Sequence, residues 1–274
     1  MNARIRNFLF FISIVMNQLN AYIILFDLGR TLVDVNKLAY AYYEIGLMDL
    51  VLNGLINGGN FNPQKRMFET LERLGGSQSD VMHEKGVLLP KIYCDWMAGA
   101  FDDAHSTRQW ILTQVDGLHM QGFFNSEVEY RVIYNAIQAM FSPEKLVKYQ
   151  QAIWPMIALL ERIDKKAHKV VAVTNWDQHS YPLFLASAVG QELQKHIHAD
   201  DMIVSGYIKH NKPSRYFYQA IFEKYGDNPA QYIFVDDNPC NILAAQECGI
   251  TSFLFTGNEV SIEKEFKNRS ILKP

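Results

Sequence analysis

Polar side chains of four kinds lie at or just beyond the ends of expected strands in this sequence, and together they suit phosphoryl transfer. They are a lone carboxylate, a hydroxyl beside an amide, a lysine and a pair of carboxylates, found at Asp27, Thr174–Asn175, Lys212 and Asp236–Asp237. A phosphate monoester carries about two negative charges, which must be neutralised before an anionic carboxylate can attack phosphorus. We therefore expect the lysine to neutralise charge at a site where Asp27 is the nucleophile.

A magnesium ion is the second expected part of this site. Mg²⁺ prefers hard oxygen ligands, and Asp27, an aspartate of the 236–237 pair and a backbone carbonyl would supply them. Thr174 and Asn175 would hold the phosphoryl oxygens by hydrogen bonds. Attack by the carboxylate would give an aspartyl-phosphate, which water then hydrolyses.

Short apolar runs predict the strands that position these residues. The run at 22–28 contains Asp27 near its end, and from about residue 150 further runs alternate with helical segments. Such alternation predicts an α/β fold, a doubly wound parallel sheet with helices on both faces. Ligands of such sheets bind at the carboxyl ends of the strands, where the polar residues lie. The later runs occupy residues 170–173, 202–204, 232–235 and 251–254.

The segment between the first two predicted strands has helical patterns only. Apolar residues recur at helical spacing over 36–55, and Pro63 and Pro143 stand at expected helix starts. Ser126 and Glu129 form a capping-box pattern ahead of another helix. We therefore expect an all-helical cap domain inserted into the core. The expected bounds are 1–21 for an N-terminal extension, 22–34 and 150–274 for the core, and 35–149 for the cap.

The N-terminal extension has two interpretations. Arg4 and Arg6 precede an apolar run at 8–16, which is too short to span a bilayer. The run has the length of the apolar region of a signal peptide, and cleavage after Ala21 would leave the first strand whole. We expect an accessory segment of a cytoplasmic protein, with export of a cleaved protein as the alternative.

Composition limits the classes of partner. The 274 residues, 49% of them hydrophobic, suffice for a packed core with a smaller second lobe. A net charge of −3, without a long run of lysine or arginine, gives no electrostatic footprint for nucleic acid. Three scattered cysteines, Cys94, Cys240 and Cys248, suit a reducing compartment. Nothing in the sequence indicates an oligomeric state.

In order along the chain, the polar clusters resemble the four motifs of the haloacid dehalogenase superfamily. The matching segments are Phe26–Asp34, Val173–Trp176, Lys212–Pro213 and Phe234–Asn238 with Asn241. The helical segment between the first two has the position of the family's C1-type cap. The resemblance implies a Rossmann-like core and a Mg²⁺-dependent phosphatase that acts on a small phosphorylated metabolite.

The resemblance also implies roles in catalysis and substrate binding for matching residues. Asp27 would be the nucleophile, Thr174 the phosphate ligand and Lys212 the charge neutraliser. Asn175 would bind the phosphoryl group with them. Arg30, which replaces a usually small residue, would either meet the substrate or point to solvent.

The same resemblance implies a set of metal ligands. Mg²⁺ would bind to Asp27 and to the backbone carbonyl of Gly29. Asp236 and Asp237 would serve the ion as well, and Asp237 would be the more direct ligand of the two. Two further residues would support these groups from one layer behind them: Thr31 and Asn241.

Gly29 departs from the family pattern, which places a second aspartate there as general acid and base. No side chain at this position protonates the leaving group, although general acid–base catalysis contributes about 10²–10⁴-fold. Family members with glycine at this place are associated with sugar-phosphate hydrolysis, which makes a sugar phosphate one candidate substrate.

Two other functions stay open at this point. The missing acid at Gly29 motivates a non-catalytic protein that binds phosphate or serves as a scaffold. A 2-haloacid dehalogenase would use Asp27 to attack carbon and would need no metal. The aspartate pair at 236–237 argues against the dehalogenase, because that reaction has no use for it.

Overall fold

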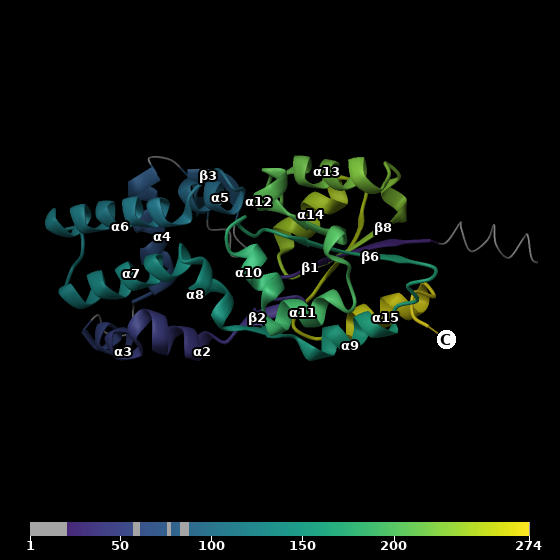
Figure 1. The fold of residues 1–274 in the computed structure, drawn as a ribbon, viewed down its shortest axis with the longest axis horizontal. Helices are drawn as coiled ribbons and strands as arrows, with labels where there is room; N and C mark the ends of the chain where they lie inside the picture. The colour runs from purple at the N-terminus through teal and green to yellow at the C-terminus, as the bar shows by residue number, and fades with distance from the viewer. Residues whose placement is uncertain (1–20, 57–60, 76–77, 83–87, 274) are drawn as a thin grey trace, which may run out of the picture.

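A computed structural model of the chain describes residues 21–56, 61–75, 78–82 and 88–273, and it has a helical lobe at one end of a sheet-containing core (Figure 1). The predicted N-terminal extension, apart from its last residue, lies outside the described residues. Within the described ranges, no helix is both long and apolar enough to cross a membrane.

Five strands form the parallel sheet that the sequence predicts, in the order β7-β6-β1-β8-β9. The register pairs Asp27 with Val173, so Thr174 lies one residue beyond Asp27 on β6. On the other side of β1, Asp236 is the last residue of β8 and lies level with Asp27. The polar clusters therefore meet at one edge of the sheet. The strands are β1 (Ile23–Asp27), β6 (Lys169–Thr174), β7 (Met202–Val204), β8 (Tyr232–Asp236) and β9 (Thr251–Leu254).

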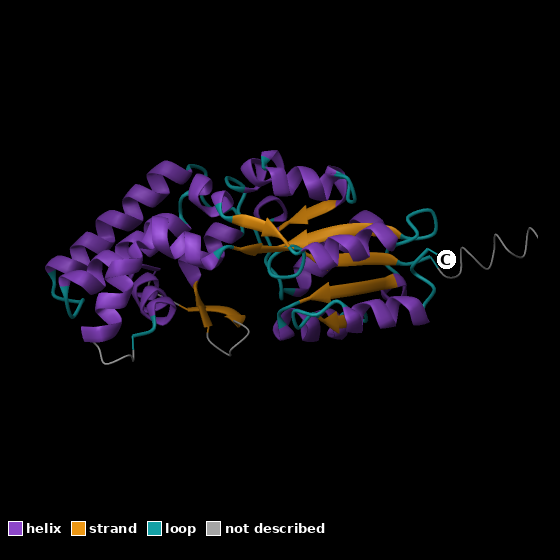
Figure 2. Ribbon diagram, turned by 90° about the horizontal axis from the view of Figure 1, so that it is seen from below, coloured by secondary structure: helices purple, strands orange, loops and turns teal. Residues whose placement is uncertain are grey.

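Side chains alternate along the central strand, and this alternation explains why helices cover both faces of the sheet (Figure 2). Ile24 and Phe26 pack on one face against α9, α10, α11 and α15. Leu25 points to the other face and packs against α13 and α14. Burial on both faces is typical of strands in parallel sheets. The core helices are α9 (Trp154–Arg162), α10 (Tyr181–Ala186), α11 (Ala188–Gln194), α12 (Ser205–Ile208), α13 (Arg215–Tyr225), α14 (Pro239–Glu247) and α15 (Val260–Asn268), with short 3₁₀ turns η2 (Ala199–Asp201) and η3 (Pro229–Gln231).

The elements from α2 to α8, which we call the cap, form the inserted helical lobe that the sequence predicts. They pack around their own apolar core. One short antiparallel hairpin, formed by β3 and β4, adds to the predicted all-helical cap. β4 has only three residues, and the five residues of β3 do not alternate between apolar and polar, so neither segment shows the pattern that predicts a strand. The elements are α2 (Lys37–Tyr40), the π-helical η1 (Ala41–Gly46), α3 (Leu47–Ile56), α4 (Pro63–Gly75), β3 (Gln78–Met82), β4 (Leu88–Pro90), α5 (Lys91–Met97), α6 (Ala104–Met120), α7 (Glu127–Met140) and α8 (Pro143–Lys148).

A two-stranded ribbon carries the chain into and out of the cap. Strand β2 (Val33–Val35) pairs antiparallel with β5 (Gln150–Ala152). At the cap end of the ribbon, the Asn36 amide donates to the Tyr149 carbonyl at 2.9 Å. The two chain segments that connect the core to the cap therefore lie side by side, on one edge of the junction between cap and core.

A second junction, which we call the latch, holds the carboxyl end of α5 against the core. Carbonyl groups at a helix end lack partners within the helix. Here, side chains of the core donate hydrogen bonds to carbonyl groups at and just beyond the end of α5. Gly99 permits the close approach, because its φ is 66° and a Cβ there would lie 2.2 Å from the Gly206 carbonyl oxygen. In Figure 1, α5 beside α12 marks the latch, and β2 lies at the opposite edge of the junction. The contacts join Ser205 to Met97 (2.6 Å), Lys209 to Gly99 (2.5 Å), Gln178 to Phe101 (2.9 Å), His179 to Phe101 (2.8 Å) and Asn211 to Cys94 (2.7 Å).

Glu129 is a buried carboxylate that ties two cap helices together. Its Oε1 accepts a hydrogen bond from Arg66 Nε at 2.5 Å, and its Oε2 accepts one from the Asn125 amide at 2.8 Å. Ser126 caps α7 as predicted, since its hydroxyl accepts from the Glu129 amide at 3.1 Å. The predicted capping box stays half-formed, because the Glu129 side chain binds Arg66 and Asn125 instead of the Ser126 amide.

Replacing this carboxylate should destabilise the cap. We expect Glu129→Ala to lower the free energy of unfolding by about 3 kcal/mol, because a mostly buried guanidinium loses its most buried partner. Glu69→Ala is the matched control. Glu69 binds the same Arg66 at 3.1 Å from a more exposed position, and its loss should cost less than about 1 kcal/mol. Urea denaturation followed by circular dichroism measures the free energy of unfolding of both variants. Equal losses would contradict the conclusion that Glu129 is the more important partner of Arg66.

Candidate active site

Asp27 is held at the end of β1 by the turn that follows it. The Leu28 carbonyl accepts the Leu32 amide at 2.9 Å, and both leucine side chains are fully buried. The turn is thereby anchored in the core beneath Asp27. Gly29 and Arg30 lie on its exposed side, and Arg30 adopts the left-handed conformation with φ 61°.

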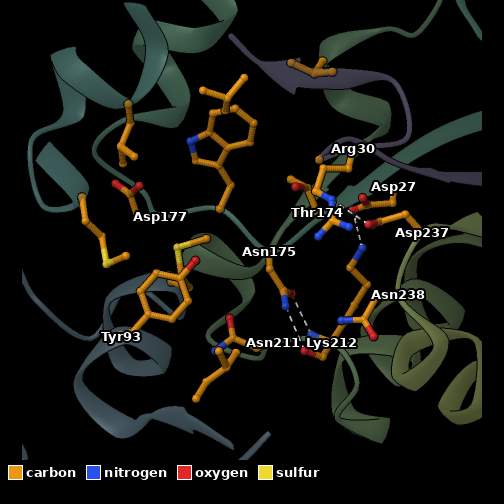
Figure 3. A pocket seen from close by; sticks show the side chains of 18 of the residues that line it. Asp27, Arg30, Tyr93, Thr174, Asn175, Asp177, Asn211, Lys212, Asp237 and Asn238 are labelled. Atoms are coloured by element: carbon orange, nitrogen blue, oxygen red, sulfur yellow. Dashed lines mark hydrogen bonds and ion pairs between the residues drawn. The ribbon is translucent and has the colours of Figure 1, made fainter. Parts of the chain in front are cut away.

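Lys212 is the buried cation at the centre of the site (Figure 3). Its Nζ donates to Asp27 Oδ1 at 2.5 Å, to Asp236 Oδ2 at 2.8 Å and to the Val173 carbonyl at 3.1 Å. An ammonium group has three hydrogens, so each of them has an acceptor. The lysine therefore connects the ends of three neighbouring strands, β6, β1 and β8.

Asn175 fixes the backbone of Lys212. Its Nδ2 donates to the Lys212 carbonyl at 2.8 Å, and its Oδ1 accepts from the Lys212 amide at 2.7 Å. Both ends of the Asn175 amide are therefore engaged, as Figure 3 shows. In the structure this side chain makes a reciprocal contact with the lysine backbone, between residues far apart along the chain. Asn175 also lines the cavity above Asp27, and its binding of phosphoryl oxygens stays a prediction.

The two neighbouring aspartates, Asp236 and Asp237, have different surroundings. Asp236 is fully buried; its Oδ1 accepts from the Asn238 amide at 2.7 Å, and Asn241 Nδ2 lies 3.0 Å from its Oδ2. Asp237 retains 14% of its side-chain surface and forms an ion pair with Arg30, whose Nε lies 3.1 Å from Asp237 Oδ2. Asp236 is thus held in place by the protein, whereas Asp237 faces the open side of the site.

The charges in the site influence one another. Burial raises the pKa of the Asp27 carboxyl, Lys212 lowers it, and the other two aspartates raise it further, so the pKa lies well above its usual value. Burial lowers the pKa of Lys212, but the attraction of Asp236 and Asp27 outweighs burial and raises it. Lys212 is therefore a permanent cation. The three aspartates outnumber the two positively charged side chains, Lys212 and Arg30. The site therefore attracts a further cation.

The three aspartates fit a magnesium ion. One carboxylate oxygen from each of Asp27, Asp236 and Asp237 lies within 4.8 Å of the others, and such oxygens are the ligands Mg²⁺ prefers. Asp236 already accepts hydrogen bonds at both oxygens, so Asp237 is the better placed direct ligand. Gly29, whose carbonyl is the remaining expected ligand, lines the same cavity.

A cavity of about 510 Å³ lies between the core and the cap, above Asp27. From the core, Asp27, Arg30, Thr174, Lys212 and Asp237 line it. The opposite wall comes from the cap and is mostly apolar. The described cap residues in this wall are Tyr40, Gln64, Met67, Phe68, Leu89, Tyr93, Cys94, Met97, Met140 and Leu146.

All of the predicted site residues except Asp236 and Thr31 line this cavity. Asp236 lies directly behind it in contact with Lys212, and Asn241 supports Asp236 as described above. Thr31 is fully buried, and its hydroxyl has no hydrogen-bond partner among the described residues. The supporting role predicted for Thr31 therefore stays a prediction, with no hydrogen bond from its hydroxyl to accompany it among the described residues.

Sequence reasoning missed several residues that line the cavity. Asp177 is buried and accepts hydrogen bonds from the amides of His179 and Ser180. Asn211 lies beside the expected Lys212, and this adjacency was the available signal. Tyr93 belongs to the cap, where no motif marked a site. The cap wall as a whole was not predicted, because it depends on how α4 and α5 dock over the core.

Comparison with known proteins identifies similar chains. The model of a family described as haloacid dehalogenase-like hydrolase matches residues 23–249. A HAD family enzyme from Bacteroides thetaiotaomicron has a TM-score of 0.51 at 17% identity, over 89% of this chain and 98% of that one. Its magnesium complex gives the same values. A predicted HAD-like family hydrolase from Porphyromonas gingivalis has a TM-score of 0.50 at 15% identity, over 90% of this chain and 98% of that one. At these identities, the similarity to solved structures shows a shared fold.

Removing the central lysine should destabilise the core. We expect Lys212→Met to lower the free energy of unfolding by about 3–5 kcal/mol, because two buried carboxylates lose their counter-charge. Lys195→Met is the matched control. Lys195 also lies 2.5 Å from a carboxylate, that of Glu192, but 65% of its side chain is exposed, and its loss should cost at most about 1 kcal/mol. Urea denaturation in the presence of a chelator compares the two. Similar losses would argue against an energetic role for the buried lysine.

Proposed function

The chain belongs to the haloacid dehalogenase-like hydrolase family, and we propose that it is a Mg²⁺-dependent phosphatase acting on a small phosphorylated metabolite. One observation carries the proposal. The Asp27 carboxylate lines a cavity between core and cap, with a buried lysine bound to its Oδ1 and two further carboxylates beside it. This arrangement supplies a nucleophile, a positive charge and cation ligands at one point, as phosphoryl transfer requires. The magnesium complex of the similar Bacteroides enzyme supports the choice of ion.

In the proposed reaction, Asp27 Oδ2 attacks phosphorus while the bond from phosphorus to the ester oxygen breaks. Oδ1 is bound to Lys212 at 2.5 Å, so Oδ2 is the oxygen left for attack. The electron pair of the broken bond leaves with the ester oxygen, and an aspartyl-phosphate remains. Water then cleaves this intermediate, which releases inorganic phosphate and regenerates the carboxylate.

Residues of the core would hold the phosphoryl group during this reaction. Lys212 brings a fixed positive charge next to the nucleophile. Thr174 lies one residue beyond Asp27 on the neighbouring strand and offers a hydroxyl donor. Arg30 is 49% exposed and pairs with Asp237, so its guanidinium is able to turn from that carboxylate to a phosphate oxygen.

The proposed ligands of Mg²⁺ are Asp27, Asp237 and the Gly29 carbonyl, with Asp236 held behind them. The bound ion would neutralise the phosphoryl oxygens as a Lewis acid. Binding at Asp237 would compete with the ion pair to Arg30. Release of that arginine toward the cavity would couple the arrival of the cation to the binding of the phosphate.

Gly29 determines how the leaving group departs. A Cβ at this position would have Asp27 Oδ2, at 3.8 Å, as its nearest heavy atom, so the space beside the nucleophile is open. No side chain there donates a proton to the ester oxygen. The leaving group must depart as an oxyanion or take its proton from water. A phosphate-binding protein without turnover is the alternative that this gap motivates.

The nucleophile can be tested directly. Wild-type protein with Mg²⁺ should hydrolyse acetyl phosphate, and Asp27→Asn should lower kcat by at least about 10³-fold, because an amide cannot form the intermediate. A chelator should abolish wild-type turnover and added Mg²⁺ should restore it. Asp200→Asn, a substitution at an exposed position, serves as the control. Equal turnover in wild type and Asp27→Asn would rule out Asp27 as the nucleophile.

An acidic side chain can be introduced at position 29 by substitution. Gly29 does not occupy the left-handed region, and the open space beside it admits a side chain. We expect Gly29→Asp to raise kcat for an alkyl phosphate by about 10–10²-fold, the lower part of the range for general acid–base catalysis. Gly29→Ala is the control, because it fills the same space without an acid. A gain in both variants, or in neither, would contradict this account of the leaving group.

A further inference from the structure

We infer that the substrate is a phosphate ester of a phenol-like hydroxyl that carries an apolar aromatic group, an inference that rests on the proposed phosphatase activity. Two independent observations point to this class. The first is the apolar wall that the cap places opposite the nucleophile. The second is the lack of a proton donor at Gly29.

The cap wall is suited to an apolar group. Met67, Phe68, Leu89, Met97 and Met140 all line the cavity, and none of the described cap residues in this wall carries a charge. Methionine and aromatic side chains adapt to flat, polarisable rings. A sugar has several hydroxyl groups that would each need a hydrogen-bond partner here, and this wall offers few.

The charged residues of the cavity are already committed to the core or to its chemistry. Asp177 is fully buried, and its Oδ1 accepts the amides of His179 and Ser180 at 2.9 and 2.8 Å. Asp34, on the ribbon, accepts its neighbour's amide at 2.8 Å. The remaining charges, next to Asp27, would be used by the phosphate. On the cap side, the organic part of the substrate therefore meets a wall that has no charged side chain among the described residues.

A small number of polar atoms lie in the cap wall and in the part of the core next to it. Burial raises the pKa of Tyr93 to about 12, so its hydroxyl is neutral and the wall stays uncharged. Asn211 donates through Nδ2 to the Cys94 carbonyl at 2.7 Å, while its buried Oδ1 has no partner among the described residues. Figure 3 shows Asn211 beside Tyr93 on the cap side of the site. One donor on the aromatic group would satisfy this acceptor.

The missing acid selects the same class of leaving group. A phenol has a pKa of about 10, whereas an alcohol resembles water, with a pKa of about 16. A phenolate therefore leaves without a proton far more readily than the alkoxide of a sugar. Because Gly29 provides no acid, esters of acidic hydroxyls are the substrates that this site can cleave fastest.

The size of the cavity agrees with one or two rings. A volume of about 510 Å³ lies in the range of pockets that enclose small organic ligands. The latch holds the α5 part of the wall in place, because Met97 lies on that helix and its own carbonyl is bound by Ser205 at 2.6 Å. The wall is thus tied to the core that carries the nucleophile.

A substrate series tests the inference on the full-length wild-type protein with Mg²⁺. Turnover of acetyl phosphate measures the chemistry of the core alone. The other two substrates, 2-naphthyl phosphate and glucose 6-phosphate, differ in their organic group. We expect kcat/KM for 2-naphthyl phosphate to exceed that for glucose 6-phosphate by at least about 100-fold. Comparable or higher values for glucose 6-phosphate, with acetyl phosphate cleaved by wild type and not by Asp27→Asn, would overturn the inference and leave the phosphatase standing. Failure to cleave any of the three would overturn both.

Cap variants provide the second arm of the test. Met97→Gln and Met140→Gln each place an amide in the apolar wall, and each should lower the ratio of kcat/KM for 2-naphthyl phosphate to that for acetyl phosphate by about 10-fold. Two variants are used so that misfolding of one leaves the other. Met120→Gln is the matched control, because Met120 lies on the cap surface with 85% exposure. An unchanged ratio in both wall variants would overturn the inference.

Discussion

The buried ammonium group of Lys212 is the interaction on which the rest of the site depends. It lies between the carboxylates of Asp27 and Asp236 and also reaches a carbonyl of β6. A lone charge in this position would be very costly, and the cost is offset because every hydrogen has an acceptor. The lysine can hold this position because Asn175 binds its backbone at both the amide and the carbonyl. The proposed nucleophile, the lysine and the proposed metal ligands therefore form one interdependent unit.

The cap and the core contribute different parts of the cavity, and two junctions hold them together. The ribbon of β2 and β5 connects them through the chain, while the latch connects them through side chains that bind the carbonyl groups of residues 94–101. The proposed phosphate chemistry would depend on the core alone, since the carboxylates and Lys212 lie there. The cap supplies an apolar wall, which in our proposal selects the organic group of the substrate. Such a division lets the wall change while the catalytic unit remains intact.

The turn after β1 shows how one small segment adjusts the chemistry. Gly29 removes a side chain that would transfer a proton, and Arg30 adds a guanidinium on the open side of the site. The arginine balances part of the negative charge of the aspartates through Asp237. The loss at one position is thus accompanied by a gain of positive charge at the next. In the proposed reaction, both features would favour a phosphate ester whose leaving group departs without a proton from the protein.

Much of this protein was determined by local sequence. Apolar runs of strand length, each ended by polar residues, predicted the parallel sheet, and parallel strands bring their carboxyl ends to one edge regardless of detail. That rule sufficed to bring Asp27, Thr174 and Asp236 together. Composition and helical spacing likewise predicted the inserted cap. Only the tertiary structure decided that Asn175 binds the backbone of Lys212, that the Thr31 hydroxyl makes no hydrogen bond among the described residues, and that an apolar wall faces Asp27. These features depend on contacts between distant segments, whose geometry follows from packing of the whole chain and leaves no periodic pattern in the sequence.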